Sequence, residues 1–391
     1  MKFLIIFIIT LFLLQLTTDN IFAKKSLHIN ACADKGNNWR CHSHIETDES
    51  FNPKVKNLPE GFGPKQFLEA YNLKGRVKTN TTVAIVDAFD NPNIFNDINH
   101  YSKTFNIPLM NECPINKGSI LHPCFQKVNQ KGGSNPPSID SGWASETALD
   151  GEIIHGLCQN CNILLVEANS DSFNDLITAF DRATSMGADV ISNSYGGREF
   201  SEEKSFDSHF NHPGIAITFS SGDSGYGPEY PAASKFVTAV GGTTLKINSN
   251  NTYLSEKAWD GAGSGCSKYE SKPSWQNDKK CSNRTIADVS ADADPNTGAA
   301  IYNSLSFKGQ KGWFKVGGTS LASPIIATVY AQAGNIKSNI AGNSIPYKSN
   351  ARLHDVIDGN NGNCKTSYLC RAIKGYDGPT GLGSPNGLSG F

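Results

Sequence analysis

The chain has 391 residues, a formal net charge of −1 and only 18% charged residues, so it has neither the basic field of a nucleic-acid-binding protein nor an acidic tail. Its length suffices for one large domain or two ordinary ones. The 37 glycines and 18 prolines, among many Asn and Ser residues, indicate a loop-rich globular protein rather than a helical bundle.

The first 23 residues have the pattern of a secretory signal peptide. Lys2 precedes an apolar run over residues 3–16, and Ala23 offers a small residue for cleavage before two lysines. The run is shorter than the roughly 20 apolar residues that a membrane-spanning helix needs, so the alternative of a membrane anchor fits less well. We therefore expect a secreted protein without membrane contact once the signal is removed.

Ten cysteines fall into five close pairs, as expected for an exported protein held by local disulfides. The CxxC pair has two alternatives, a redox pair and half of a zinc site, but neither a thioredoxin-like setting nor a second CxxC accompanies it. The pairs are Cys32/Cys41, Cys113/Cys124, Cys158/Cys161, Cys266/Cys281 and Cys364/Cys370.

Residues 24–61 form a polar, irregular N-terminal segment that contains His42 and His44. We interpret it as a short segment before the main domain and as a candidate pro-segment.

From about residue 62 onward, segments typical of strands and helices alternate. Buried strands are predicted over residues 82–86, 162–168, 189–192 and 214–219, and an amphipathic helix over residues 173–186. This alternation indicates a parallel sheet covered by helices on both faces. Functional residues gather at the carboxyl ends of such strands, where both Asp87 and the turn 220–223 are expected.

A helix predicted around residues 144–155 presents two acidic side chains on one face. Glu146 and Asp150 are four residues apart, and their like charges disfavour each other unless they share a proton in a partly buried site. A raised carboxyl pKa suits a group that acts first as base and then as acid. The alternative is a solvated acidic face that includes Glu152. His155 lies nine residues after Glu146 and so points to the opposite side of the helix.

The sequence GGTSLASP at residues 317–324 precedes an apolar run over residues 325–331 that is typical of a helix. A serine on a tight glycine turn at a helix N-terminus is exposed to substrate, and the unpaired N–H groups beside it face incoming negative charge. Ser320 is therefore a candidate nucleophile for attack on a carbonyl. The alternative is an ordinary capped helix, in which Ser, Thr and Pro are also common.

Three motifs, in this order, resemble those of the sedolisins, the serine-carboxyl peptidases of the subtilase superfamily. They are Glu-x-x-x-Asp at residues 146–150, Ser-Gly-Asp-Ser-Gly at 221–225 and Gly-Thr-Ser-x-x-x-Pro at 318–324. The resemblance covers roughly residues 62–391. It implies one peptidase domain over residues 62–391, with a subtilisin-like α/β fold whose mainly parallel central sheet is flanked by helices. Further similar segments lie at residues 192–197, 230–234, 240–244 and 288–291.

The resemblance also implies a role for each motif. Ser320 is the expected nucleophile, Glu146 its general base and later the acid for the leaving amine, and Asp150 the group that orients Glu146. Asp223 is expected at the oxyanion position, where it must be protonated to donate a hydrogen bond, and this implies activity in acid. Asp87 and Tyr195 are expected next to Glu146 and Asp150, where they would support the acidic pair without reacting themselves.

In the C-terminal part, the resemblance implies one structural calcium ion, for which carboxylate and carbonyl oxygens from turns are suitable ligands. A turn without an ion is the alternative. The expected ligands are the side chains of Asp355 and Asp377 and the backbone oxygens of Val356, Ile373 and Gly375.

The resemblance, together with these residues, thus implies a monomeric, acid-active endopeptidase that acts on protein or peptide substrates. It would work outside the cell or in an acidic compartment of the secretory and endosomal route, with no nucleic-acid partner. A tripeptidyl exopeptidase of the same family and a non-catalytic binding protein on a peptidase fold are the alternatives. A subtilisin-type enzyme using Asp87, His155 and Ser320 is another, and it is opposed by the helix geometry, which points His155 and Glu146 apart.

Overall fold

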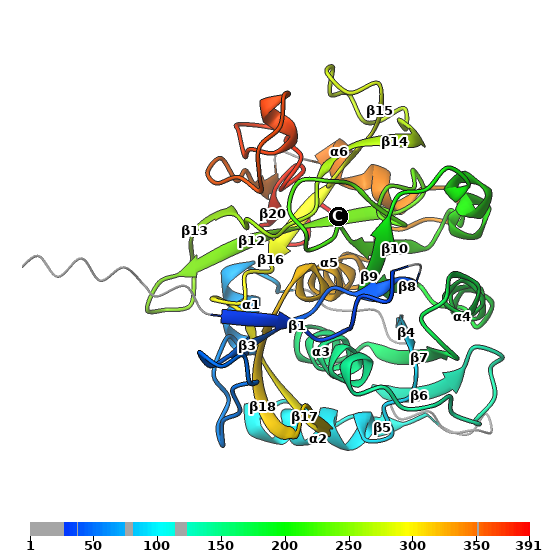
Figure 1. Cartoon of the computed structure of the whole chain (residues 1–391), viewed down its shortest axis with the longest axis vertical. Helices are drawn as coiled ribbons and strands as arrows, with labels where there is room; N and C mark the ends of the chain where they lie inside the picture. The colour runs from blue at the N-terminus through cyan, green and yellow to red at the C-terminus, as the bar shows by residue number, and fades with distance from the viewer. Residues whose placement is uncertain (1–26, 37, 75–80, 114–122, 350–351) are drawn as a thin grey trace, which may run out of the picture.

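A nine-stranded sheet forms the centre of the molecule, in the order β13-β12-β10-β8-β4-β7-β6-β5, with β16 also paired to β12 (Figure 1). The computed structural model describes residues 27–36, 38–74, 81–113, 123–349 and 352–391, so the signal peptide expected over residues 1–23 lies outside the described part. Every neighbouring pair in the sheet is parallel except β12 with β13, which confirms the predicted mainly parallel sheet. The strands are β4 (Thr82–Ala88), β5 (Asn111–Glu112), β6 (Cys124–Asn129), β7 (Asn162–Ala168), β8 (Val190–Asn193), β10 (Ala216–Ser220), β12 (Thr238–Ile247), β13 (Tyr253–Ala258) and β16 (Val289–Asp292).

The central strands are buried on both faces, as their sequences require. β4 reads TVAIVDA and β7 reads NILLVEA, and the two pair in register from Thr82 opposite Asn162 to Ala88 opposite Ala168. Runs of apolar residues without alternation are typical of a parallel sheet that is covered on both sides. The predicted strands are present with bounds shifted by one or two residues, and β4 continues one residue beyond Asp87.

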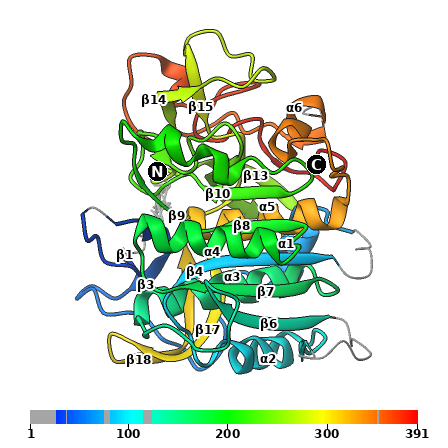
Figure 2. The same ribbon diagram turned by 90° about the vertical axis from the view of Figure 1, so that its right-hand side faces the viewer.

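Helices cover both faces of the sheet. α4 (Phe173–Ser185) lies on one face, and α3 (Ser141–Leu157) and α5 (Thr319–Ala333) lie on the other (Figure 2). α3 and α5 are buried along nearly their whole length because they also contact β17 (Ala299–Phe307) and β18 (Gln310–Gly317). No helix among the described residues has the length and apolar character needed to cross a membrane. Shorter helices are α1 (Pro64–Ala70), α2 (Ile94–Phe105) and α6 (Ile345–Ser349).

The described part of the N-terminal segment, residues 27–61 without 37, packs directly onto this domain (blue in Figure 1). β1 (Leu27–Asn30) and β3 (His44–Thr47) extend a second sheet in the order β1-β3-β18-β17. A third sheet consists of β2 (Arg40–Cys41), β9 (Tyr195–Arg198) and β11 (Glu229–Tyr230). The N-terminal segment is therefore hydrogen-bonded to the rest of the chain through two different sheets.

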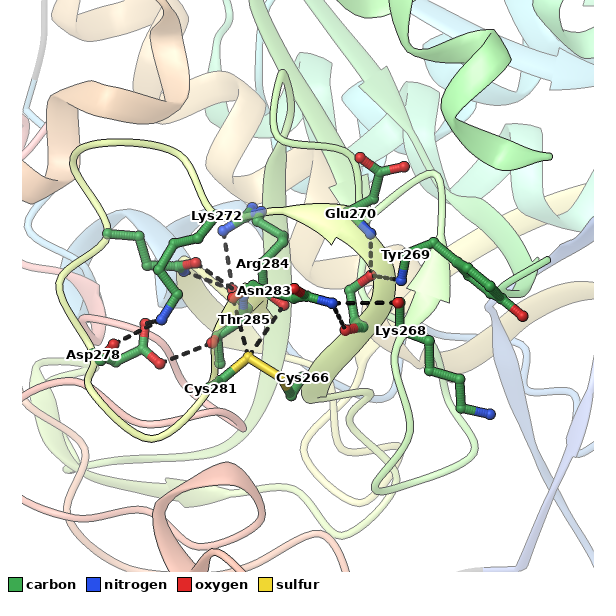
Figure 3. Close-up of a disulfide and its surroundings, with 12 residues drawn as sticks. Cys266, Lys268, Tyr269, Glu270, Lys272, Asp278, Cys281, Asn283, Arg284 and Thr285 are labelled. Carbon is green, nitrogen blue, oxygen red and sulfur yellow. Dashed lines mark hydrogen bonds and ion pairs between the residues drawn. A yellow bond between two sulfur atoms is a disulfide. The ribbon is translucent and has the colours of Figure 1, made fainter. Parts of the chain in front are cut away.

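All five predicted disulfides are present, the CxxC pair included, and no cysteine is free. One of them, Cys266–Cys281, closes the hairpin formed by β14 (Gly265–Ser271) and β15 (Asn283–Ile286) (Figure 3). Beside it, Asn283 Nδ2 donates to two backbone oxygens of β14 at 2.9 and 3.2 Å. A covalent link and side-chain hydrogen bonds thus hold the hairpin together.

Candidate active site

Ser320 lies in the first turn of α5, directly after the glycine turn. Its hydroxyl oxygen accepts a hydrogen bond from the His42 backbone N–H at 3.0 Å and donates to the Ser194 backbone oxygen at 3.1 Å. Gly318 has a φ of +99°, which favours glycine. Pro324 has no N–H for the Ser320 carbonyl, which accepts from Ser194 Oγ instead at 3.3 Å. Ser320 is fully buried, so the expected exposure to substrate is wrong for this arrangement, because the His42 backbone lies over it.

Glu146 and Asp150 lie one turn apart on α3, and both carboxyls are fully buried. Ser194 Oγ donates to Asp150 Oδ1 at 2.9 Å. Burial is the main reason that the pKa of each carboxyl lies well above its usual value, and the charge of Asp87 raises both further. The Ser320 hydroxyl beside Glu146 opposes that shift only in part. The structure therefore brings the predicted nucleophile and the predicted acidic pair together.

Asp87 and Tyr195 approach this group from β4 and β9. Burial raises the pKa of Asp87 to about 7, and the nearby Thr147 side chain lowers it only in part. The Tyr195 hydroxyl donates to Asn193 Oδ1 at 3.1 Å, and burial together with the charge of Asp87 raises the pKa of Tyr195. Both residues lie where the sequence places them, around the acidic pair, and their supporting roles stay predictions.

His155 and Glu152 make their contacts elsewhere. His155 is buried, its Nε2 lies 2.7 Å from the Pro108 backbone oxygen, and burial lowers its pKa. Glu152 is also buried and accepts from the Tyr302 N–H at 2.9 Å. The geometry contradicts the subtilisin-type alternative, because His155 bonds to a backbone carbonyl and not to Ser320. The alternative of a solvated acidic face is wrong as well, because none of the acids on this helix reaches solvent.

Asp223 lies beside the N-terminus of α5. Its Oδ1 accepts from the Thr319 N–H at 2.8 Å and from the Thr319 hydroxyl at 2.6 Å, and its Oδ2 lies 3.2 Å from His44 Nε2. Burial disfavours the ionised form, but His44, His42 and Thr319 together outweigh burial and lower the pKa of Asp223. Because a histidine from the N-terminal segment lies against it, Asp223 takes up its proton only in more acidic solution, and its role at the oxyanion position stays a prediction.

Sequence reasoning gave no role to the residues that the N-terminal segment and β11 bring to the site. The fully buried His42 imidazole has Nδ1 2.6 Å from Ser220 Oγ and Nε2 3.0 Å from Glu229 Oε2. The one available signal is the pair His42 and His44 close to a cysteine in a polar segment. An irregular segment has no periodicity that would show where it packs.

The predicted calcium ligands lie in neighbouring C-terminal turns. The N–H of Gly375 donates to both carboxylate oxygens of Asp355, at 3.1 and 3.0 Å, and the N–H of Ile373 donates to Asp377 Oδ2 at 2.9 Å. Val356, which directly follows Asp355, is buried.

This donor set fits a hard cation. Asp377 is fully buried, and burial in the first place, with the Asp355 charge in addition, raises its pKa to about 8. A divalent cation would offset the repulsion between the two carboxylates. No three His, Cys, Asp or Glu side chains gather as a metal site in the described ranges, so backbone oxygens would have to supply the other protein ligands.

Comparison with known proteins shows which family this chain resembles. The subtilase family profile matches residues 138–351, which include Glu146, Asp150, Asp223 and Ser320. The chain is 29% identical to sedolisin of Pseudomonas sp. (strain 101) over 394 residues, which cover 88% of this chain and 63% of that protein. It is 30% identical to kumamolisin of Bacillus sp. (strain MN-32) over 306 residues, which cover 69% of this chain and 54% of that protein.

A solved structure of Pseudomonas sedolisin (serine-carboxyl proteinase), complexed with two molecules of pseudo-iodotyrostatin, superimposes with a TM-score of 0.69 at 29% identity. The superposition covers 84% of this chain and 96% of the sedolisin chain. A probable tripeptidyl-peptidase of Arthroderma benhamiae also matches, at 28% identity over half of this chain. The chain spans 63% or less of the length of these curated relatives.

Proposed function

Because the chain belongs to the subtilase family and, within it, to the sedolisins, we propose that it is a serine-carboxyl peptidase that hydrolyses peptide bonds in acid. The observation that carries this proposal is that the Ser320 hydroxyl lies near enough to the buried Glu146 carboxyl to lower its pKa in part, although in this arrangement the hydroxyl donates to the Ser194 backbone oxygen and neither Glu146 oxygen has a hydrogen-bond partner. A serine hydroxyl is a weak nucleophile and needs an adjacent base. His155, which lies on the same helix as Glu146, cannot be that base because its Nε2 contacts the Pro108 backbone oxygen.

In the proposed reaction, Ser320 Oγ attacks the carbonyl carbon of the substrate while its proton passes to Glu146. Glu146 then returns the proton to the nitrogen of the leaving amine as the C–N bond breaks, and an ester on Ser320 remains. Water attacks this ester with Glu146 again as base, which releases the acid product. Asp150, which accepts from Ser194, shares a proton with Glu146 and so sets its basicity.

The proposed acid optimum follows from Asp223, whereas the acidic pair sets only the range over which its proton is shared. Buried carboxyls whose pKa is raised hold a shared proton over a pH range in which exposed carboxyls have lost theirs. Asp223 must itself be protonated to donate a hydrogen bond to the oxyanion. Since His44 lowers the pKa of Asp223, this second requirement confines activity to acid solution.

The other parts of the proposal concern the surroundings of the reaction. Asp355 and Asp377, with backbone oxygens of Val356, Ile373 and Gly375, would hold one calcium ion, whose charge would stabilise these C-terminal turns. The five disulfides and the signal-like first 23 residues favour a secreted protein. We propose that it acts as a monomer on protein or peptide substrates.

A tripeptidyl exopeptidase is the second candidate, because several matched relatives bear that name. The two candidates differ in how they treat a peptide whose N-terminus is acetylated. An endopeptidase cleaves such a peptide internally, whereas a tripeptidyl peptidase requires the free amine.

The proposal is tested by digestion of a denatured protein from about pH 3 to about pH 8, with the wild type compared with Ser320→Ala, Glu146→Gln and His155→Gln. We expect wild-type cleavage in acid only, with no cleavage by the first two variants and retained cleavage by His155→Gln. Cleavage near neutral pH that depends on His155 would overturn the carboxyl mechanism. Mass spectrometry of the products of acetylated and free peptides separates the two candidates.

A further inference from the structure

A pocket of about 460 Å³, the aromatic pocket, opens between three segments that lie far apart in the sequence. They are the loop that joins β14 to β15, helix α6 and the C-terminal turns over residues 368–382. The hairpin and these turns lie at one end of the molecule (Figure 1; Figure 2), and the residues that line the pocket are not those of the candidate active site. A cavity of this volume suits a drug-sized ligand.

Three tyrosines form a continuous wall of the aromatic pocket. The ring centroid of Tyr376 lies 6.3 Å from that of Tyr347 and 6.5 Å from that of Tyr368, with tilts of 35° and 55° between the rings. All three side chains are half-buried, and Trp275 and Leu382 add further apolar surface to the lining. Aromatic pairs prefer offset and edge-to-face contacts at such distances, so this wall favours a ligand that carries an aromatic ring.

The hydroxyl groups of the three tyrosines are already used inside the protein. Tyr347 donates to Asp288 Oδ1 at 2.6 Å, Tyr368 to Asp278 Oδ2 at 2.5 Å and Tyr376 to the Ala287 backbone oxygen at 3.0 Å. The tyrosines therefore offer ring carbons to a ligand and no free O–H donor. This favours an apolar ring over a sugar, whose hydroxyl groups would lose hydrogen bonds to water without replacement.

The polar part of the lining carries an excess of positive charge. Lys279 and Lys280 are exposed, and neither has an ion-pair partner among the residues that the structure describes. The adjacent carboxylate of Asp278 is compensated, because Lys272 Nζ lies 2.7 Å from its Oδ1 and the Thr285 hydroxyl donates to its Oδ2 at 2.9 Å (Figure 3). Two free ammonium groups beside an apolar cavity favour a ligand with an anionic end.

We propose that the aromatic pocket binds an aromatic carboxylate. The ring of this ligand lies among Trp275 and the three tyrosines, and its carboxylate pairs with Lys279 and Lys280. The inference goes beyond the proposed peptidase function and does not depend on it. A bound ligand joins the β14–β15 hairpin to the C-terminal turns, and because it binds the folded state alone it raises the melting temperature.

The first test is calorimetric titration of the full chain with naphthoate and with its uncharged analogue naphthylmethanol. It is made in a Ser320→Ala background, so that no proteolysis disturbs the titration, and at about pH 6, where a carboxylate is ionised and lysine is protonated. We expect one naphthoate per chain and an affinity about fivefold higher than that of the alcohol. No saturable binding of naphthoate below about 1 mM by the folded protein would overturn the inference.

Variants locate the two ends of the ligand. Replacing both Lys279 and Lys280 by Gln should weaken naphthoate about fivefold and leave naphthylmethanol unchanged, whereas the same replacement of the exposed Lys131 and Lys311 should change neither. An unchanged ratio of the two affinities without Lys279 and Lys280 would contradict the charge pairing. The ratio is taken within each protein, so a general loss of folded protein does not alter it.

The ring is tested by Trp275→Ala, which should weaken both probes at least about tenfold. Tyr269→Ala, on the same hairpin but outside the pocket lining, is the matched control and should leave both affinities unchanged. Thermal unfolding without ligand shows that each variant is folded. Unchanged binding in Trp275→Ala would show that naphthoate binds elsewhere and would overturn the inference.

A free aromatic acid and the C-terminal residue of a peptide share this chemistry, and competition against naphthoate separates them. Displacement by the tripeptide Ala-Ala-Phe but not by its amide would assign the pocket to peptide ends. No displacement by either peptide would assign it to free aromatic acids. Equal displacement by the tripeptide and its amide would contradict the role of the carboxylate.

Discussion

Four carboxyl groups lie buried around one serine, and their surroundings shift their pKa values in opposite directions. Burial raises the pKa of Asp87, Glu146 and Asp150, whereas His44, His42 and Thr319 lower that of Asp223 despite its burial. Groups whose environments separate their pKa values in this way are suited to different steps of one reaction.

Asp87 gives a prediction for stability. Its pKa is 3.8 in the unfolded chain and about 7 in the folded protein, so the folded state binds the extra proton between these values and loses stability as pH rises from about 4 to about 7. Asp87→Asn stays neutral, so its melting temperature should fall less over this range. Thermal unfolding across this pH range, with and without Asp87→Asn in a Ser320→Ala background, measures the fall in melting temperature. Parallel curves for the two proteins would contradict the assignment, and Glu202→Gln, an exposed carboxyl, serves as control.

His44 gives a prediction for the pH profile. His44→Gln removes a partner that lowers the pKa of Asp223, so Asp223 should keep its proton to a higher pH. The alkaline limb of the kcat profile should therefore move upward, as measured with an added peptide. His209→Gln, whose histidine pairs with Asp181 instead, should leave the limb in place. An unshifted limb in His44→Gln would rule out the proposed role of Asp223.

At the scale of elements, the site is assembled from the interior of α3, the N-terminus of α5, the carboxyl end of β4 and two strands of small sheets. The α3 acids could be predicted because a helix fixes which residues share a face, and Glu146 and Asp150 do lie together. Ser320 could be predicted because its glycine turn follows the other two motifs in the order typical of the sedolisins, whereas the turn alone also fits an ordinary capped helix. His42, Ser43 and Glu229 could not, because they belong to an irregular segment and a two-residue strand whose positions depend on tertiary pairing.

The β14–β15 hairpin gives a prediction for stability at this scale. Cys266–Cys281 joins residues 15 apart, and loss of such a link costs about 3 kcal/mol of unfolding free energy in the chain-entropy model. Replacing both cysteines by serine should lower the denaturant midpoint accordingly. Loss of the Cys364–Cys370 disulfide, whose cysteines are six residues apart, should cost less unfolding free energy, about 2 kcal/mol. A larger loss from the shorter loop would show that local packing, not chain entropy, dominates.

At the scale of the whole molecule, the alternation of strands and helices sufficed to predict the mainly parallel sheet, and cysteine spacing sufficed to predict all five disulfides. Residues 27–61 were predicted only as a segment before the main domain. Their pairing with both β9 and β18 follows from unsatisfied strand edges in the folded protein, which a sequence without periodicity does not reveal.

The C-terminal turns give a prediction for metal binding. Millimolar calcium should raise the melting temperature of the full protein by a few degrees, and a chelator should reverse the increase. Asp355→Asn should abolish the difference, whereas the exposed Asp358→Asn should keep it. Equal melting temperatures with and without calcium in the wild type would show that these turns hold no ion.

The central claim is that Ser320, and not water activated by paired carboxyls, attacks the substrate. Acid quenching during turnover of a peptide ester, followed by digestion and mass spectrometry, tests it most directly. We predict an acyl group on the fragment that contains Ser320, and none in Ser320→Ala. Sustained turnover without an acyl group on Ser320 would contradict the account and would leave Glu146 and Asp150 as activators of water.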